Sequence, residues 1–210
     1  MFDGMLYVKA KSKQFHVIPK QTKIMETTIQ KTVNGFSLDA IQETVKVLTQ
    51  NPELAQFKFR AKNKWVQGGH NRSTIHGFYG GGQEDDSRSA PFVFDNGEPP
   101  ILLGNNEGAN PVEFILHGLA GCTTTTMALH AAARGIEIES IESELEGDLD
   151  VMGFLGLNEN VRNGYREIRI NFRITGNLTD AQKEELITFA KNSPVYDVVS
   201  NGVPVKFSVK

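Results

Sequence analysis

The chain has 210 residues, of which 39% are hydrophobic and 22% charged, and its 22 basic and 25 acidic side chains give a formal net charge of −3. These values are typical of a globular domain and exclude a disordered or fibrous chain. The balance offers no global electrostatic case for nucleic-acid binding. A single cysteine excludes an intramolecular disulfide and a thiolate metal cluster, and no signal-peptide pattern opens the chain. We therefore expect a cytoplasmic protein with a reduced thiol.

Two segments precede the main body of the chain. Residues 1–24 carry five lysines against one acid, and we predict that they form a separate basic extension. Residues 25–56 are predicted to be an accessory helical segment, with a helix at 37–50. Ser37 can cap this helix, and apolar residues recur on one face at positions 38, 41, 45 and 48. Asn51-Pro52 then ends it.

A strand-rich region follows. Aromatic or small residues alternate with basic ones from Phe57 to Lys62, which is the period of a strand. Gly68-Gly69 interrupts the pattern before a second strand that contains Arg72, so the pair is predicted to form a hairpin. Residues 80–87, which include three consecutive glycines, are predicted to be a loop. They are not a phosphate loop, because no Gly-Lys-Ser/Thr follows them.

The stretch from Asn110 to Arg134 is nearly free of charge and contains the only cysteine, Cys122. Asn110-Pro111 at its start and Arg134-Gly135 at its end are typical of helix termini. We predict one helix of about six turns. Because nearly all of its faces are apolar or small, we expect it to be buried all round. A membrane span is disfavoured by its histidines, its threonines and Glu113.

The remaining pattern alternates again. Residues 141–151 and 167–174 each read as a strand with one apolar face, and the acids of the first strand suit an antiparallel pairing with Arg169 and Arg173. A capping box at Thr179 predicts a helix to about residue 191, ended by Ser193-Pro194. Alternation at 203–209 predicts a final strand. Strands, a buried helix and further strands and helices together make an α+β fold.

Cys122 alone is weak evidence for a site, because free cysteines are among the most often buried residues. A reactive thiol needs a positive neighbour or a helix N-terminus. Arg72 is a candidate cation because it follows a glycine turn, although a plain ion-paired strand arginine stays an open alternative. His117 and other histidines are read as hydrogen-bonded interior or interface residues. No HExxH, CxxC or Gly-x-Ser-x-Gly pattern is present, so we expect neither a metal nor a cofactor.

Several phrases resemble the OsmC/Ohr family, which comprises osmotically inducible and organic-hydroperoxide-resistance proteins. They are the central-helix phrases Asn110-Pro111, Leu119-Ala120-Gly121-Cys122 and Ala132-Ala133-Arg134-Gly135-Ile136, and the hairpin phrase from Gly68 to Ile75. The resemblance covers residues 57–210, which would be an OsmC-like domain, and points to a longer subgroup with a preceding helix. It implies an antiparallel sheet packed around a buried central helix, in an intertwined homodimer with no membrane or nucleic-acid partner.

The family also implies a cysteine-based peroxidase with its sites at the subunit interface. Cys122 maps to the peroxidatic cysteine and Arg72 to the arginine that stabilises its thiolate. The family's glutamate directly follows the Asn-Pro pair, where this chain has Val112, and Glu113 stands one position further on. Substrate-pocket candidates are His117, Leu119 and Ser193.

The resolving cysteine of the family maps to Ser193, so the usual disulfide cannot form. We therefore expect reduction of organic hydroperoxides by a single cysteine that an external thiol regenerates. The alternative is a dimer of the same fold that binds a small apolar or thiol ligand without turnover. The missing glutamate and the missing second cysteine both favour this alternative.

Overall fold

The structure is a computed structural model that describes residues 31–209, so the predicted basic extension lies outside the described residues. A small hairpin of β1 (Thr32–Val33) and β2 (Phe36–Ser37) leads directly into helix α1 (Leu38–Gln50). The Ser37 hydroxyl accepts a hydrogen bond from the Ala40 N–H, which confirms the predicted cap. No residue of α1 is buried in the described chain, and a short 3₁₀ turn at Pro52–Ala55 follows it.

A three-stranded antiparallel sheet comes next, with β4 in its centre. Its strands are β3 (Lys62–Gln67), β4 (His70–Ile75) and β7 (Phe92–Asn96). The predicted hairpin at Gly68-Gly69 is confirmed, and Gly68 has a positive φ of 51°. The strand begins at residue 62 rather than 57, because the strand-type pairing of residues 57–61 in the described chain is limited to an isolated bridge between Lys58 and Tyr79.

The predicted loop at 80–87 is wrong. Strands β5 (Phe78–Gly80) and β6 (Gln83–Asp85) pair as a hairpin around Gly81-Gly82. Both glycines have positive φ, 58° and 84°, as a tight two-residue hairpin turn requires. Gly81 and Gly82 thus form the turn of a hairpin, and the polar residues after them form a strand instead of the predicted loop.

Helix α2 (Pro111–Ala133) confirms the predicted central helix. The Asn110 side chain accepts from the Val112 N–H at 3.0 Å, and the Glu113 carboxylate accepts from the Asn110 N–H at 2.8 Å, so the two residues form a capping box. At the other end, Gly135 has a φ of 69° and the Ile136 N–H donates to the Ala131 carbonyl. This is the glycine-based helix end that the sequence predicts.

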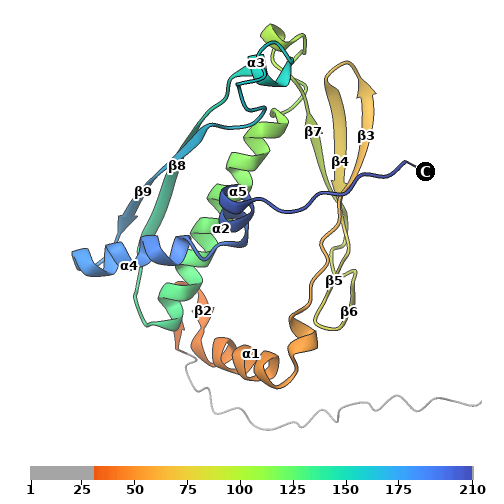
Figure 1. The fold of residues 1–210 in the computed structure, drawn as a ribbon. Coiled ribbons are helices and arrows are strands. Elements are labelled where there is room, and N and C mark those ends of the chain that lie inside the picture. Colours follow the sequence, from red (N-terminus) through yellow and green to blue (C-terminus); the bar gives the residue numbers. More distant parts are fainter. Residues whose placement is uncertain (1–30, 210) are drawn as a thin grey trace, which may run out of the picture.

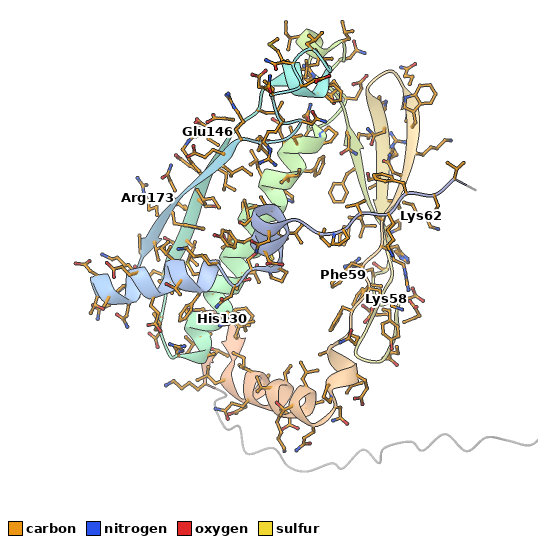
Figure 2. All side chains as sticks on the ribbon, in the orientation of Figure 1. Lys58, Phe59, Lys62, His130, Glu146 and Arg173 are labelled. Atoms are coloured by element: carbon orange, nitrogen blue, oxygen red, sulfur yellow. The ribbon has the colours of Figure 1, made fainter. Side chains whose placement is uncertain are left out.

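The predicted antiparallel pair is confirmed as β8 (Ser140–Asp148) and β9 (Glu167–Thr175). The first strand ends at residue 148 rather than 151, because Asp150 caps the short helix α3 (Val151–Phe154) in the connection. Glu142 lies opposite Arg173, and Glu146 opposite Arg169. Figure 2 shows Glu146 and Arg173 on the outer side of this hairpin, away from α2. The acidic row is therefore a partly ion-paired outer face of the hairpin.

The C-terminal region departs from the prediction. Helix α4 (Asp180–Ala190) has the predicted Thr179 capping box, but Ser193 caps an unpredicted helix, α5 (Pro194–Asn201). The predicted final strand is wrong for this chain, because residues 203–209 have no regular secondary structure. Figure 1 shows this segment running away from α5, with no strand of its own chain paired along it.

The core lies where α2 meets α4 and the start of β8. Its buried members are Met127, Ala131, Ile136, Leu186, Phe189 and Ala190. In Figure 1, β8 and β9 lie on one side of α2, and β3, β4 and β7 stand on the other side. Only part of α2 is covered, since Ile115 and Leu129 remain 42% and 38% exposed. The prediction that α2 is buried all round is therefore wrong for the single chain.

Two neighbouring residues of α4 test where the core lies. Leu186 is fully buried and Ile187 is 38% exposed. We predict that Leu186→Ala lowers the free energy of unfolding by about 2–5 kcal/mol, because it removes buried contacts and leaves a cavity. Ile187→Ala is the matched control and should cost clearly less in the same urea titration. Equal losses for the two variants would contradict this placement of the core.

Candidate functional site

Cys122 lies in the middle of α2 with its thiol free and partly exposed. It belongs to a stripe on this helix, Ile115, Gly118, Cys122, Thr125 and Leu129, whose members recur at alternating spacings of three and four residues. We call this the α2 stripe. Such spacing places side chains on one helix face. A Cβ built on Gly118 would meet nothing within 4 Å, so the stripe is open at this position in the described chain.

The side of α2 that carries Met127 and Ala131 packs into the core. Leu119 and Thr123 are buried as well, and the Thr123 hydroxyl donates to the Leu119 carbonyl at 2.7 Å. Ser193 is also fully buried, and its hydroxyl accepts from the Tyr196 N–H at 3.2 Å. Leu119 and Ser193, two of the predicted pocket residues, are thus packed into the interior of this chain. In the position expected of a resolving cysteine, Ser193 serves as a helix cap.

The residues around the missing glutamate take structural roles. Glu113 completes the capping box, so its carboxylate is committed to the first turn of α2. The carbonyl of Val112 accepts from the Tyr165 hydroxyl at 3.0 Å, which ties that turn to the chain just before β9. Burial, together with the charge of Glu113, raises the pKa of Tyr165. Tyr165 therefore stays a neutral donor at physiological pH.

An open hollow of about 340 Å³ lies beside this first turn of α2. It is lined by Phe94, Ala109, Glu113, Phe114 and His117. Phe94 and Phe114 meet edge to face, with ring centroids 5.8 Å apart, and His117 lies edge-on to Phe114. Of the predicted pocket residues, His117 is thus the one that lines an accessible apolar hollow.

Arg72 is held by Asp95, which lies directly opposite it on β7. The guanidinium donates to both carboxylate oxygens, at 2.8 and 3.2 Å, and His70 contacts the same carboxylate at 2.8 Å. The His70 side chain is only 14% exposed, whereas that of Arg72 is 53% exposed. The more buried histidine therefore anchors one side of the aspartate, and the aspartate orients the arginine.

Arg72 and Cys122 are not brought together within one chain. Phe94 pairs with Ser73, the neighbour of Arg72, so the side chains of Phe94 and Arg72 lie on opposite faces of the sheet. Phe94 contacts Phe114 of α2, so Arg72 is on the face turned away from that helix. Figure 2 shows Lys62 on the outer side of this sheet and Phe59 on the side toward α2. No hydrogen bond or ion pair within residues 31–209 joins Arg72 to Cys122.

Sequence reasoning missed Asp95 and the part played by His70. The alternating pattern of β7 can predict a strand, but it does not fix the register that sets Asp95 opposite Arg72, because that register depends on pairing between distant segments. In the described part of the chain, no three His, Cys, Asp or Glu side chains are grouped so as to hold a metal ion. Among residues 31–209, no helix combines the length and apolarity needed to cross a membrane.

Comparison with known proteins places the chain in a family. The model of the OsmC-like protein family matches residues 104–208, which is half of the chain. A comparison with curated proteins gives no match. A solved OsmC-like protein from Mycoplasma pneumoniae is 19% identical, covers 69% of this chain and 88% of its own, and superposes with a TM-score of 0.51.

A second solved structure comes from Legionella pneumophila and is described as the organic hydroperoxide resistance protein OsmC, a predicted redox protein and regulator of sulfide bond formation. It is 20% identical, covers 72% of this chain and 96% of its own, and has a TM-score of 0.51. At such identities the structures establish the shared fold. The fold is thus that of an α+β protein built around one long helix, and the family match shows that the chain belongs to the OsmC-like family.

The contact between Asp95 and Arg72 predicts a pH effect. The guanidinium of Arg72, and then His70, lower the pKa of Asp95 below its ordinary value of about 3.9. A carboxyl with a depressed pKa stabilises the fold above its unfolded-state pKa, and this contribution is lost as pH falls through its folded-state pKa. We predict that Arg72→Ala raises the pKa of Asp95 in a carboxyl-carbon NMR titration. Arg60→Ala, which frees Glu84 instead, should leave the pKa of Asp95 unchanged.

Proposed function

We propose that the protein is a thiol-dependent hydroperoxide reductase in which Cys122 is the nucleophile. The Cys122 thiolate attacks the distal oxygen of an organic hydroperoxide, and the O–O bond breaks. The alkoxide takes up a proton and leaves as an alcohol, while the cysteine becomes a sulfenic acid. One external thiol then forms a mixed disulfide with Cys122 and releases water. A second thiol displaces the cysteine and leaves with the first as a disulfide.

The observation that carries this proposal is the position of Cys122. The thiol is partly exposed on the α2 stripe, which is open at Gly118, rather than on the buried face of the helix. A structural cysteine would be expected among the core residues around Met127. Membership of a family that includes a hydroperoxide resistance protein supports the same reaction.

The need for an external thiol follows from two features. The chain has one cysteine, and the residue at the position of a second one, Ser193, is buried and caps α5. A hydroxyl cannot form a disulfide with an oxidised Cys122. The apolar residues that share the α2 stripe with Cys122, Ile115 and Leu129, favour an organic hydroperoxide over hydrogen peroxide.

A homodimer is part of the proposal. The exposed apolar residues of the α2 stripe are matched by Trp65, Phe92 and Phe94 on the face of the sheet toward α2, which are 68%, 53% and 36% exposed. Exposed apolar side chains on both the α2 stripe and the facing side of the sheet are typical of a protein–protein interface. A second copy would cover it, and Arg72 can then act on a thiolate only if the assembly brings a Cys122 to its side of the sheet.

The reaction is tested by a peroxidase assay. We predict that cumene hydroperoxide is consumed with excess dithiothreitol, and that Cys122→Ser abolishes this consumption because it removes the nucleophile. Thr125→Ser, on the same stripe, is the matched control and should retain activity. Unchanged consumption by Cys122→Ser would refute the proposal. Stoichiometric ligand binding by the wild type without consumption would favour the alternative of a binding protein.

The dimer is tested separately by its mass. Light scattering of the full chain in gel filtration should give about twice the monomer mass of 23.2 kDa, because the apolar stripe and sheet face need cover. Gly118→Leu should lower this mass by blocking close approach at the stripe. Lys191→Leu, on the exposed end of α4, is the control. A monomer mass for the unmodified chain would contradict the proposed dimer.

A further inference from the structure

Arg88 is a charged side chain held against aromatic rings just before β7. Its guanidinium carbon lies 5.3 Å from the ring centroids of both Phe78 and Phe92, a distance at which cation–π attraction acts. The guanidinium also donates a hydrogen bond to the His76 carbonyl, and the His76 ring contacts the Arg88 carbonyl oxygen at 3.1 Å. Two rings and a backbone group therefore fix the position of this cation.

The rings beside Arg88 belong to the side of the sheet that faces α2. Phe92 is two residues from Phe94 on β7, so the two side chains point to the same side, and Phe94 is in contact with α2. Phe78 packs against Phe59, with ring centroids 5.5 Å apart, and Figure 2 shows Phe59 on the side toward α2. The guanidinium of Arg88 is therefore on the α2 side as well.

Within residues 31–209, no carboxylate forms an ion pair with Arg88, whereas Arg72 on the other face of the sheet is paired with Asp95. Hydrogen bonds from Ser87, and then the charge of Arg88, lower the pKa of Asp85, but its carboxylate accepts from the Ser87 N–H and hydroxyl, at 2.9 and 2.6 Å. Arg88 is half-buried in the single chain, and a second copy that covers this face would remove it from water. Because a buried guanidinium without a counter-charge is costly, the assembly needs an anion at this point.

Helix α2, the other surface that the proposed homodimer covers, can supply that anion. Between Pro111 and Ala133 the one carboxylate is that of Glu113, which is committed to the capping box. The remaining group of this helix that can become an anion is the thiol of Cys122, in the middle of the α2 stripe. The charge on the sheet side and the potential charge on the helix side are therefore complementary.

The surroundings of the two groups match. Arg88 lies between two aromatic rings, and Cys122 lies between the apolar ends of the α2 stripe, so each surface presents an ionisable group among apolar side chains. We propose that in the assembled protein the guanidinium of Arg88 pairs with the thiolate of Cys122, which makes Arg88 a further catalytic residue. This inference rests on the proposed peroxidase and homodimer, and it places a cation on the opposite side of the sheet from Arg72.

The pair would act at two points of the proposed reaction. A guanidinium beside the thiol favours the thiolate, so Cys122 releases its proton to water at a lower pH and becomes the nucleophile. When the O–O bond breaks, the same positive charge stabilises the departing alkoxide until it takes up a proton. Arg88 itself keeps its charge throughout, because a guanidinium does not deprotonate in proteins.

The experiment measures the pKa of the Cys122 thiol in the full chain, from the ultraviolet absorbance of the thiolate as the pH is raised. Arg88→Met should raise this pKa to about its ordinary value of 8.5, because the neighbouring charge is lost. Arg88→Lys keeps a positive charge and should keep the pKa low. Arg173→Met, which removes a charge from the outer face of β9, is the matched control and should leave the pKa unchanged.

The rate of hydroperoxide consumption gives a second readout. At about pH 7, Arg88→Met should consume cumene hydroperoxide at least about tenfold more slowly, since a thiol of ordinary pKa is only a few per cent ionised there. This deficit should shrink as the pH rises past the thiol pKa of the variant, because both proteins are then thiolates. A residue with a purely structural role would lower the rate by the same factor at every pH.

The outcomes separate the inference from the proposals beneath it. A thiol pKa that is the same in wild type and Arg88→Met overturns the role of Arg88 alone. The peroxidase and the homodimer are decided independently, by Cys122→Ser and by the mass of the full chain, and failure of either removes the basis of the pair. Circular dichroism and light scattering check each variant. If Arg88→Met does not fold, Arg88→Gln takes its place, because glutamine keeps a donor for the His76 carbonyl without the charge.

Discussion

The uncovered stripe of helix α2 is the constraint on which the rest of the structure depends. The helix is apolar on nearly every face, yet the described part of its own chain, chiefly α4, α5, β8 and the core around Met127, covers it only in part. The side with Gly118 and Cys122 is partly exposed in the single chain, and we propose that a second copy covers it. A single chain does not bury this helix fully, because the sheet of β3, β4 and β7 meets it through the contact of Phe94 with Phe114 and otherwise leaves an apolar face of its own exposed.

Local chemistry predicted the elements whose signals are local. The caps at Ser37, Asn110 and Thr179 were read from side chains that accept hydrogen bonds from the next turn. The pairing of β8 with β9 followed from two-residue alternation and from opposite charges on facing strands. Cys122 was found as the lone thiol in an uncharged helix, and the family assignment from the phrases around it is confirmed.

Features that depend on partners far along the chain were missed. The C-terminal alternation predicted a strand, but a strand needs a neighbour, and residues 203–209 have no regular secondary structure because no strand of the described chain pairs with them. Helix α5 was missed because Ser193-Pro194 was read as an end, although a serine cap followed by proline also begins a helix. The clamp of Asp95 on Arg72 required the register of β7, which no local pattern fixes. The roles assigned to Cys122 and Arg72 stay predictions.

The proposed one-cysteine reaction rests on a partly exposed thiol on α2, an oriented guanidinium and a buried serine in place of a second thiol. Its central claim is that Cys122 itself takes the oxygen, and the most direct test is to trap that product. Mass spectrometry after one equivalent of cumene hydroperoxide, with dimedone and no reductant, should find the adduct on the Cys122 peptide, as expected of a sulfenic acid. A Cys122 peptide that stays unmodified while hydroperoxide is consumed would contradict the account.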